Sequence, residues 1–428
     1  MFIINTQWKY YFQRPVLIIF FLGFSAGLPF PLVYSTMTYW LAEANVVRST
    51  IGAFAWLGFA YSFKVFWAPL VDQIKIPFLS KLLGRRRGWL LFCQLMLLFS
   101  LMCLANTNPL VDISLFALLA GIVAFFSATQ DIVIDAYRIE SAELKLQGIM
   151  AASYQYGYRV ALIVATAGAL FIAELASWSI AYQVMAVFMF VGLITTLICR
   201  EPVTLKLTSQ ILGKNLYDKF YYWLNISVIS PFSDFIRRYG SKGFVILAFI
   251  SCFYVSDRVL GIMAMPFYED IGFSKSQVAT VAKLYGLWVS MFGAAIGGIA
   301  VVRIGLAKCI VLGSIFIFST NLFFSFLAWV GADLTFLTIT ISFDNFAVGF
   351  GSTVMIAYMS SLVNMKYTAT QYALLSSINT FLGKLLAGFS GDIQMSLGWI
   401  NFFLYAAATG IPAILLALIL ARKGIEAN

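Results

Sequence analysis

The sequence contains no histidine among its 428 residues. This absence excludes a Ser-His-Asp triad, an HExxH zinc site and any proton relay built on imidazole. The five cysteines stand singly in apolar stretches, without a CxxC pair, so they indicate neither a disulfide framework nor a metal site. We interpret them as core or lipid-facing residues.

Charge is also scarce, at 11% of the chain against roughly 25% in an ordinary soluble domain. Hydrophobic residues make up 61% of the chain. This balance predicts an all-α polytopic membrane protein. The net charge of +10 would suggest a nucleic-acid partner in a soluble protein, so its meaning depends on where the cations fall.

Apolar runs of roughly 20 residues, bounded by charges or turn residues, predict twelve transmembrane helices. They cover residues 16–40, 50–70, 88–106, 113–136, 149–173, 178–199, 243–267, 278–301, 308–330, 334–361, 371–391 and 399–421. The first run is too long for a signal-peptide core, so we expect it to stay as a helix. One long basic connection divides the runs equally, which predicts an N-terminal half (1–199), a cytoplasmic linker (200–242) and a C-terminal half (243–428).

Lysine and arginine fall mainly on one side of these predicted helices. Most of the 28 lie in the two termini, the linker and the loops on the same side as the N-terminus, and only Arg48 and Lys275 fall in loops on the other. Cytoplasmic loops carry such an excess, so we expect both termini in the cytoplasm. The net positive charge is then explained by cytoplasmic loops that anchor the helices in the membrane, and no nucleic-acid partner is expected.

A few charges remain inside the predicted helices. They are the cations Lys64, Arg159, Arg258, Lys283 and Lys384, and the acids Asp131, Asp135, Asp257 and Asp344. Charges at this depth face protein or water rather than lipid, so a helix without them is peripheral. The third, sixth, ninth and twelfth runs have none, which is the pattern of a major-facilitator fold built from three-helix repeats.

The stretch 126–138 (FSATQDIVIDAYR) concentrates these charges. Asp131, Asp135 and Arg138 are four and seven residues apart, so they share one helical face, with Gln130 beside it. One interpretation is a salt-bridged network that includes Lys64. The other is that Gln130 and Asp131 contact a substrate, or that one carboxylate binds a coupling proton.

Further residues complete the predicted substrate or proton path and the predicted gate. The path adds Arg159, Asp257, Lys283, Asp344, Asn345 and Lys384, and the gate consists of Asp72, Arg85, Arg86, Arg87, Arg138 and Arg303. Residues 68–72 with 84–88, and residues 298–305, read as two degraded copies of one loop motif. Prolines and glycines predict interruptions in the first helix (Gly23 to Pro31) and in the seventh (Gly261 and Pro266).

An enzyme is the alternative class. Two aspartates one helical turn apart suit magnesium, as in membrane prenyltransferases, but such enzymes need a second aspartate cluster, and Asp257 and Asp344 stand alone. A non-transporting receptor is the third class, and it would tolerate neutral substitutions at the buried charges. We expect a transporter, with no enzymatic activity, no metal and no cofactor.

The chain resembles the AmpG muropeptide permeases of the major facilitator superfamily. The resemblance lies in residues 23–29 (GFSAGLP), 63–72 (FKVFWAPLVD), 84–91 (GRRRGWLL), 127–136 (SATQDIVIDA) and 369–377 (ATQYALLSS), together with Asp257 and Lys283. It implies a monomeric permease of the bacterial inner membrane that uses the proton gradient to import N-acetylglucosaminyl-anhydro-N-acetylmuramic acid and its peptides for cell-wall recycling. Related transporters of another anionic cargo, such as acetyl-coenzyme A, remain an alternative.

Overall fold

The computed structural model describes residues 8–46, 50, 54–202, 225 and 229–422, and within these ranges the chain is helical with no strand. Ten helices in this part are long and apolar enough to cross a membrane. Predicted runs 113–136 and 334–361, for example, are helices α10 (Ile113–Glu140) and α22 (Leu334–Leu362). The predicted fold class, an all-α polytopic membrane protein, is confirmed.

The two remaining predicted runs differ from the ten for separate reasons. The second, residues 50–70, includes positions outside the described ranges, and its described part consists of the short helices η2 (Phe54–Leu57), α6 (Gly58–Phe63), η3 (Lys64–Phe66) and α7 (Ala68–Gln73). The eleventh is α23 (Thr368–Ala387), a continuous helix of 20 residues that carries many polar side chains. Residues 203–224 and 226–228 of the predicted linker also lie outside the described residues.

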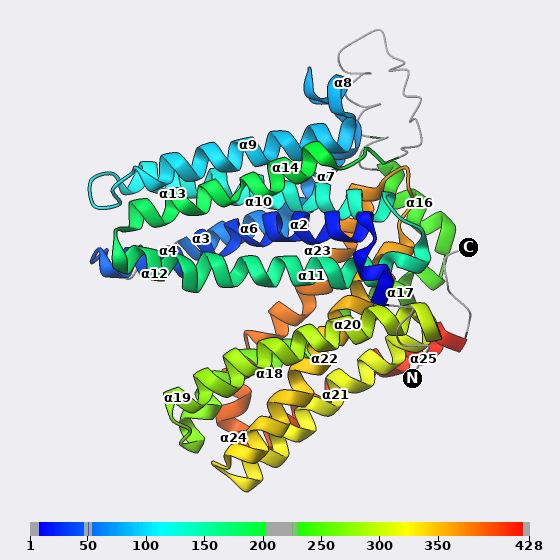
Figure 1. Cartoon of the computed structure of the whole chain (residues 1–428). Coiled ribbons are helices and arrows are strands. Elements are labelled where there is room, and N and C mark those ends of the chain that lie inside the picture. The colour runs from blue at the N-terminus through cyan, green and yellow to red at the C-terminus, as the bar shows by residue number, and fades with distance from the viewer. Residues whose placement is uncertain (1–7, 47–49, 51–53, 203–224, 226–228, 423–428) are drawn as a thin grey trace. The chain divides into compact units, whose positions relative to one another are not determined.

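The chain forms two compact units. Unit 1 comprises residues 1–143, 153–232 and 364–373, and unit 2 comprises 144–152, 233–363 and 374–428. The other elements of unit 1 are η1 (Trp8–Phe12), α2 (Arg14–Gly27), α3 (Pro29–Leu32), α4 (Ser35–Glu43), α8 (Leu79–Leu83), α9 (Arg85–Ala105), most of α11 (Gln147–Ile163), η5 (Val164–Gly168), α12 (Ala169–Leu175), α13 (Trp178–Phe188) and α14 (Phe190–Ile198). Figure 1 shows its long helices running side by side.

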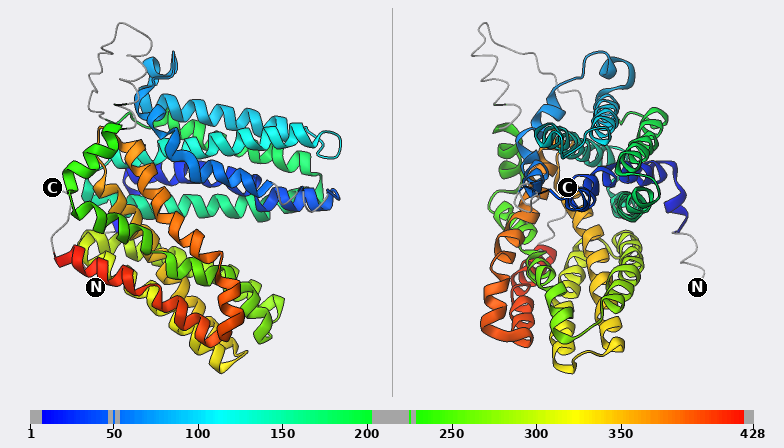
Figure 2. Two further views of the ribbon diagram at one scale, coloured as in Figure 1. Left: turned by 180° about the vertical axis from the view of Figure 1, so that it is seen from behind. Right: turned by 90° about the vertical axis from the view of Figure 1, so that its left-hand side faces the viewer.

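Unit 2 is a second helical bundle. It contains η4 (Leu144–Leu146), most of α16 (Ser230–Tyr239), α17 (Lys242–Cys252), α18 (Val255–Ile271), α19 (Lys275–Val278), η7 (Ala279–Tyr285), α20 (Gly286–Ile304), α21 (Leu306–Val330), α22, most of α23, α24 (Ser390–Ala408) and α25 (Ile411–Arg422). Helix α22 packs against both α20 and α21. The end-on view in Figure 2 shows the helices of each unit packed around one another.

Prolines interrupt the first helix where the sequence predicts it. Helix α2 ends at Gly27, Pro29 begins the single turn α3, and α4 resumes at Ser35. The interruption predicted in the seventh helix at Gly261 and Pro266 is wrong, because α18 continues through both. Transmembrane helices tolerate proline when neighbouring helices support the freed backbone groups. The break lies instead between α17 and α18, just before Asp257.

Two pairs of matching helix starts support the internal repeat. Gly84 and Gly305, which precede α9 and α21, have φ angles of 95° and 83°, a region that favours glycine. Asp112 and Asp333 cap α10 and α22, each accepting a hydrogen bond of 2.9 Å from a first-turn backbone N–H. The third and ninth helices, and the fourth and tenth, therefore begin alike.

Helices α2 and α11 approach closely through small residues. A Cβ atom added to Gly23 would lie 2.3 Å from the carbonyl oxygen of Tyr154, and one added to Gly27 would lie 2.5 Å from that of Tyr158. Glycine permits such backbone contact between membrane helices. This contact fixes the position of α11, whose Tyr154 and Tyr158 lie beside the buried charges.

Replacing Gly23 with valine is expected to push α11 away from α2, because the clash is with backbone and cannot be relieved by a side-chain rotation. Overpacking of this kind costs about 1–3 kcal/mol. Thermal unfolding in detergent measures the loss. Gly261→Val is the matched control, since a Cβ there meets nothing within 4 Å, and an equal loss in both variants would contradict the proposed contact.

Candidate functional site

The charged face of α10 lies in the interior of unit 1. Asp135 Oδ1 accepts a hydrogen bond from Arg138 Nη2 at 3.4 Å, and the Arg138 side chain is fully buried. The guanidinium also lies over the ring of Tyr372, 5.3 Å from its centroid, a cation–π arrangement. The predicted pairing within α10 is therefore present between Asp135 and Arg138.

Asp131, one turn earlier, is held differently. Its Oδ1 atom is buried and has no hydrogen-bond partner among the described residues. Lys64 on η3 lies within electrostatic range of both Asp131 and Asp135. Tyr61 and Tyr158 are also electrostatic neighbours of Asp131. An acceptor atom without a protein donor in such a place can accept a hydrogen bond from water, from a bound proton or from a ligand.

Gln130 is fully buried against α2. Its Nε2 donates to the Ser25 carbonyl oxygen at 2.9 Å, and its Oε1 accepts from the Ser25 hydroxyl at 3.0 Å. Both ends of the amide are thus occupied by one residue of α2. In this arrangement Gln130 joins two helices of unit 1 through both ends of its amide.

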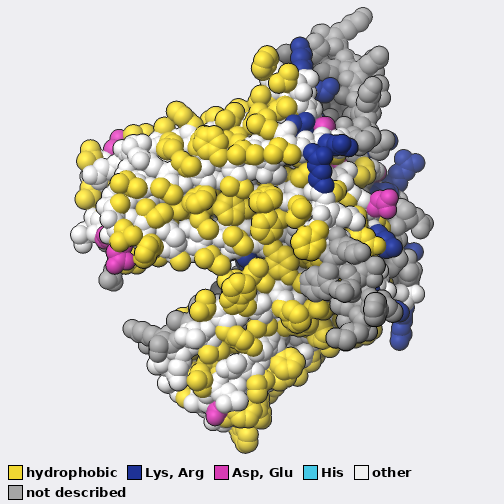
Figure 3. Space-filling view, in the orientation of Figure 1, with side chains coloured by type: hydrophobic (Ala, Val, Ile, Leu, Met, Phe, Trp, Pro, Cys, Tyr) yellow, Lys and Arg dark blue, Asp and Glu magenta, His cyan; other side chains and the backbone are white. Residues whose placement is uncertain are grey.

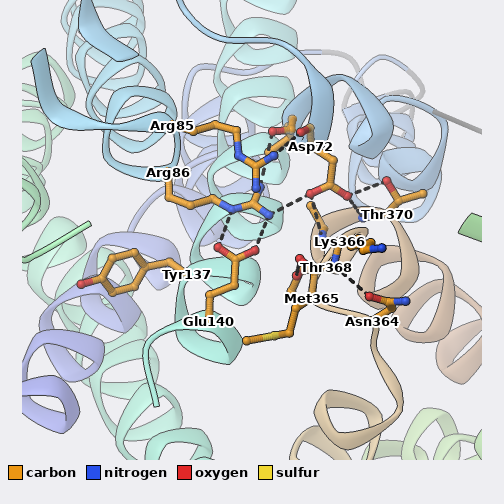
Figure 4. Close-up of polar contacts among 12 residues, drawn as sticks. Asp72, Arg85, Arg86, Tyr137, Glu140, Asn364, Met365, Lys366, Thr368 and Thr370 are labelled. Carbon is orange, nitrogen blue, oxygen red and sulfur yellow. Dashed lines mark hydrogen bonds and ion pairs between the residues drawn. The ribbon is translucent and has the colours of Figure 1, made fainter. Parts of the chain in front are cut away.

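A second cluster of charges lies where α7, α9 and α10 meet, with Arg86 at its centre (Figure 4). Arg86 Nη2 donates to Asp72 Oδ1 at 2.8 Å and to Glu140 Oε1 at 2.5 Å, and its Nε donates to Glu140 Oε2 at 3.0 Å. The side chains of Arg86, Asp72 and Glu140 are 0%, 1% and 2% exposed. One buried cation therefore holds two carboxylates from different helices.

The same Asp72 carboxylate binds the first turn of α23. Its Oδ1 accepts from the Ala369 backbone N–H at 3.2 Å, and its Oδ2 accepts from the Thr370 N–H and hydroxyl, both at 2.8 Å (Figure 4). A helix N-terminus favours a negative charge because its first N–H groups lack partners within the helix. Asp72 thereby connects α23 to Arg86.

The other predicted gate arginines bind main-chain oxygens around this cluster. Arg85 Nη1 donates to the Asp72 carbonyl oxygen, and Arg87 donates to the carbonyls of Thr196 and Leu197 at 2.9 and 2.7 Å. The last predicted member, Arg303, is exposed in the final turn of α20, within unit 2.

Sequence reasoning missed Glu140, Glu201 and Thr370. Glu201 accepts hydrogen bonds from the backbone N–H groups of Arg86 and Arg87 at 2.8 and 3.0 Å, which caps the start of α9. Burial raises the pKa of the Glu201 carboxyl, and the two N–H donors oppose that shift. An available signal was the position of Glu201, an acid directly after an apolar run on an otherwise basic side.

Unit 2 holds its own charged groups. Asp257 lies in the first turn of α18 and is an electrostatic neighbour of Asp344 on α22. Arg258 lies over the Tyr254 ring, 6.0 Å from its centroid, and is an electrostatic neighbour of Lys384 on α23. The structure thus brings Asp257 and Asp344 together, and no ion pair of 4.0 Å or less joins a cation to either among the described residues.

The remaining predicted path residues have separate surroundings. Asn345 donates to the Ile341 carbonyl oxygen of its own helix at 3.1 Å and packs against Gly286 of α20. Arg159 is half-buried on α11. Lys283 lies in the π-helix η7, and its side chain is outside the described part of the chain.

The surface indicates a protein whose helices lie in lipid. Hydrophobic side chains cover the flanks of the helices, and Lys and Arg side chains gather at one end (Figure 3). No three His, Cys, Asp or Glu side chains of the described ranges lie together as a metal site would require. The available chemistry is charge pairing, hydrogen bonding and proton binding.

Comparison with known proteins gives a consistent result. A family model described as the Major Facilitator Superfamily matches residues 15–388. A Rickettsia conorii protein named AmpG 4 is 34% identical over 407 residues, covering 95% of this chain and 96% of that protein. The anhydromuropeptide permease of Escherichia coli K12 is 30% identical over 426 residues, covering 99% of this chain and 83% of the permease.

Solved structures share the fold at low sequence identity. The transporter FucP, in its outward conformation, superposes with a TM-score of 0.68 at 11% identity, with 95% of this chain and 97% of FucP covered. The proton:xylose symporter XylE superposes with a TM-score of 0.65 at 14% identity, with 96% and 94% covered. At these identities the likeness concerns the fold alone.

Proposed function

Since this chain belongs to the major facilitator superfamily and, within it, to the AmpG transporters, we propose that it imports anhydro-muropeptides together with protons. It is a multi-pass membrane transporter, not an enzyme. The proposed cargo is N-acetylglucosaminyl-anhydro-N-acetylmuramic acid and its peptides, which a cell recovers when it recycles its wall. The proposed location is the bacterial inner membrane, with both termini in the cytoplasm and the monomer as the working form.

The observation that carries the proposal is the unfilled acceptor on Asp131. Among the described residues this buried carboxylate oxygen has no donor, and the electrostatic neighbours of Asp131 are the cation Lys64 and the tyrosines Tyr61 and Tyr158. A muropeptide presents sugar hydroxyls as donors, pyranose rings that stack on aromatics, and carboxylates that pair with a cation. Gln130 holds α10 against α2 and so positions Asp131.

Proton coupling is assigned to the acidic pair of unit 2. Asp344 has Asp257 as its electrostatic neighbour, and Asp257 in turn interacts with Arg258, whereas Asp135 in unit 1 is paired with Arg138. An ionised carboxylate buried without a cation costs free energy, and binding a proton removes that cost. Asp344 therefore binds and releases the coupling proton as its surroundings alternate.

The Asp72–Arg86–Glu140 cluster is the proposed gate. It connects α7, α9 and α10 to the first turn of α23, whose later residues belong to unit 2. Because the N-terminal turn of α23 is held by a side chain of unit 1, movement of α23 requires the Asp72 hydrogen bonds to break. Transport alternates between the bonded and the released arrangement.

Replacing Asp131 with asparagine is expected to lower both uptake and substrate binding, because the amide cannot supply the second acceptor or pair with Lys64. Losing a buried charged contact costs about 2–5 kcal/mol, which is roughly 30- to several-thousand-fold in affinity. Binding of labelled anhydro-disaccharide to purified protein measures it. Glu43→Gln, an exposed acid on α4, is the control, and wild-type binding by Asp131→Asn would contradict the assignment.

The direct test of the proposed function is uptake by proteoliposomes that contain the purified chain. Labelled anhydro-disaccharide, its tetrapeptide derivative and acetyl-coenzyme A are supplied in parallel under an outward-acidic gradient. We expect uptake of the first two and none of the third. Uptake of acetyl-coenzyme A alone would assign the chain to the other anionic cargo, and uptake of none would overturn the proposal.

A further inference from the structure

A pocket lies at the end of unit 1 where three membrane-spanning helices begin or end. Arg14 is the first residue of α2, Glu140 is the last of α10, and Ile198 is the last of α14. The pocket has a volume of about 500 Å³ and is lined by residues from these helix ends and from the chain just after α14. Because helix ends lie where hydrocarbon gives way to headgroups, the occupant of this pocket lies at headgroup depth.

The carboxylates that line the pocket are already occupied. Glu140 is paired with the buried Arg86, and Glu201 accepts the backbone N–H groups of Arg86 and Arg87. Arg85 and Arg86, which do not line the pocket, are electrostatic neighbours of both acids, so the negative charge of Glu140 and Glu201 is shared with cations other than Arg14 and Arg200.

Those two arginines are exposed. Arg14 binds the Ile198 carbonyl oxygen at 3.0 Å, and within the described residues this is the one hydrogen bond made by its five donors. Arg200 is fixed through its main chain, since its carbonyl oxygen accepts the Tyr137 hydroxyl at 2.9 Å. The pocket thus presents two guanidinium groups at headgroup depth, and guanidinium groups pair well with phosphate.

An apolar groove adjoins the pocket and shares Arg14 and Ile18 with it. It has a volume of about 270 Å³ and runs along α2 and the end of α14. Its walls include Phe12, Leu17 and Phe21, which are 76%, 41% and 44% exposed. Hydrophobic walls that run from a cationic pocket along a membrane helix match the shape of a headgroup with its acyl chain.

We propose that this pocket and groove bind one phospholipid with an anionic headgroup. Arg14 and Arg200 hold the phosphate, and one acyl chain lies along α2. Bound in this way, the lipid links the ends of α2, α10 and α14. The assignment of the lipid to the inner leaflet rests on the proposed orientation, whereas the binding itself does not depend on what the protein transports.

Native mass spectrometry of the purified full-length chain tests the proposal with palmitoyl-oleoyl phosphatidylglycerol as the probe. Arg14→Gln with Arg200→Gln is expected to weaken phosphatidylglycerol binding about 10- to 30-fold, since each basic side chain near an anionic lipid contributes to its attraction. Lys75→Gln with Lys81→Gln removes two exposed cations outside the pocket and is expected to change binding less than about 2-fold.

Two further experiments distinguish the contribution of the lipid headgroup from that of its acyl chain. Leu17→Trp fills the groove and leaves both arginines in place, so it is expected to weaken the long-chain lipid and to leave its dihexanoyl analogue unchanged. Inorganic phosphate at millimolar concentration is expected not to displace the lipid. If the double variant unfolds, Arg200→Gln alone provides the test. The Arg200 side chain makes no hydrogen bond in the described structure, so this single variant is expected to fold.

Three outcomes would overturn the proposal. They are equal binding of phosphatidylglycerol and phosphatidylethanolamine, equal losses in the pocket variant and the lysine control, or displacement of the lipid by free phosphate. The last would identify a phosphate site instead of a lipid site. None of these results bears on muropeptide uptake, so failure here is distinguishable from failure of the proposed function.

Discussion

Asp344→Asn is expected to abolish concentrative uptake while leaving counterflow nearly unchanged. Asparagine has the shape of aspartate but cannot bind and release a proton, so the variant exchanges cargo without coupling it to the gradient. One proton moving through 100 mV supplies about 2.3 kcal/mol, which sustains roughly a 50-fold accumulation. Proteoliposomes with this gradient should accumulate cargo with the wild-type chain and only equilibrate with the variant.

The matched control for Asp344 is Asp392→Asn. Asp392 lies in the first turn of α24 in the same unit and is exposed, so its neutralisation is expected to preserve accumulation. Loss of counterflow together with accumulation in Asp344→Asn would instead place Asp344 at the cargo site. Retained accumulation in that variant would remove it from the coupling mechanism.

Asp72→Ala is expected to cost the protein about 3–5 kcal/mol, because it leaves the buried Arg86 with one carboxylate instead of two and strips the first turn of α23 of its acceptor. Thermal unfolding in detergent should show a clear drop in midpoint. Thr370→Val removes only the hydroxyl hydrogen bond and should cost about 1 kcal/mol.

If Asp72 is part of a gate, its loss should make the start of α23 more accessible in the folded protein, an effect that a purely structural role does not predict. In a background whose five native cysteines are replaced, Thr370→Cys reports access to the start of α23. Adding Asp72→Ala is expected to accelerate maleimide labelling of this cysteine strongly at temperatures where the protein stays folded. Unchanged labelling in the folded variant would leave Asp72 as a stabilising residue and exclude it as a gate.

The helices themselves were predictable because their signals are local. The long apolar run ahead of Asp131 and the capping Asp112 fix α10, and the spacing of Asp131, Asp135 and Arg138 gives their common face. The break in the seventh helix was misplaced, because a proline inside an apolar helix ends it only where neighbours do not support the backbone. Local sequence does not record those neighbours.

The partners of the buried charges were beyond local reasoning. Asp72 was predicted as a latch from its position at a helix end, but its partner Thr370 is 298 residues away in the chain. The partner of Gln130 was equally unpredictable. Its side chain points about 100° around the helix from that of Asp131, and only the packing of α2 against α10 brings Ser25 within hydrogen-bond distance of the Gln130 amide. The identity of a buried polar group was predictable, whereas its partner was not.

The most direct test of proton-driven muropeptide import compares two gradients in one preparation. Proteoliposomes that contain the purified chain receive labelled anhydro-disaccharide under an outward-acidic and under an inward-acidic gradient. Proton-driven import predicts accumulation above equilibrium under the outward-acidic gradient and none under the inward-acidic gradient. A protonophore should abolish that accumulation. Equal uptake under both gradients would contradict it.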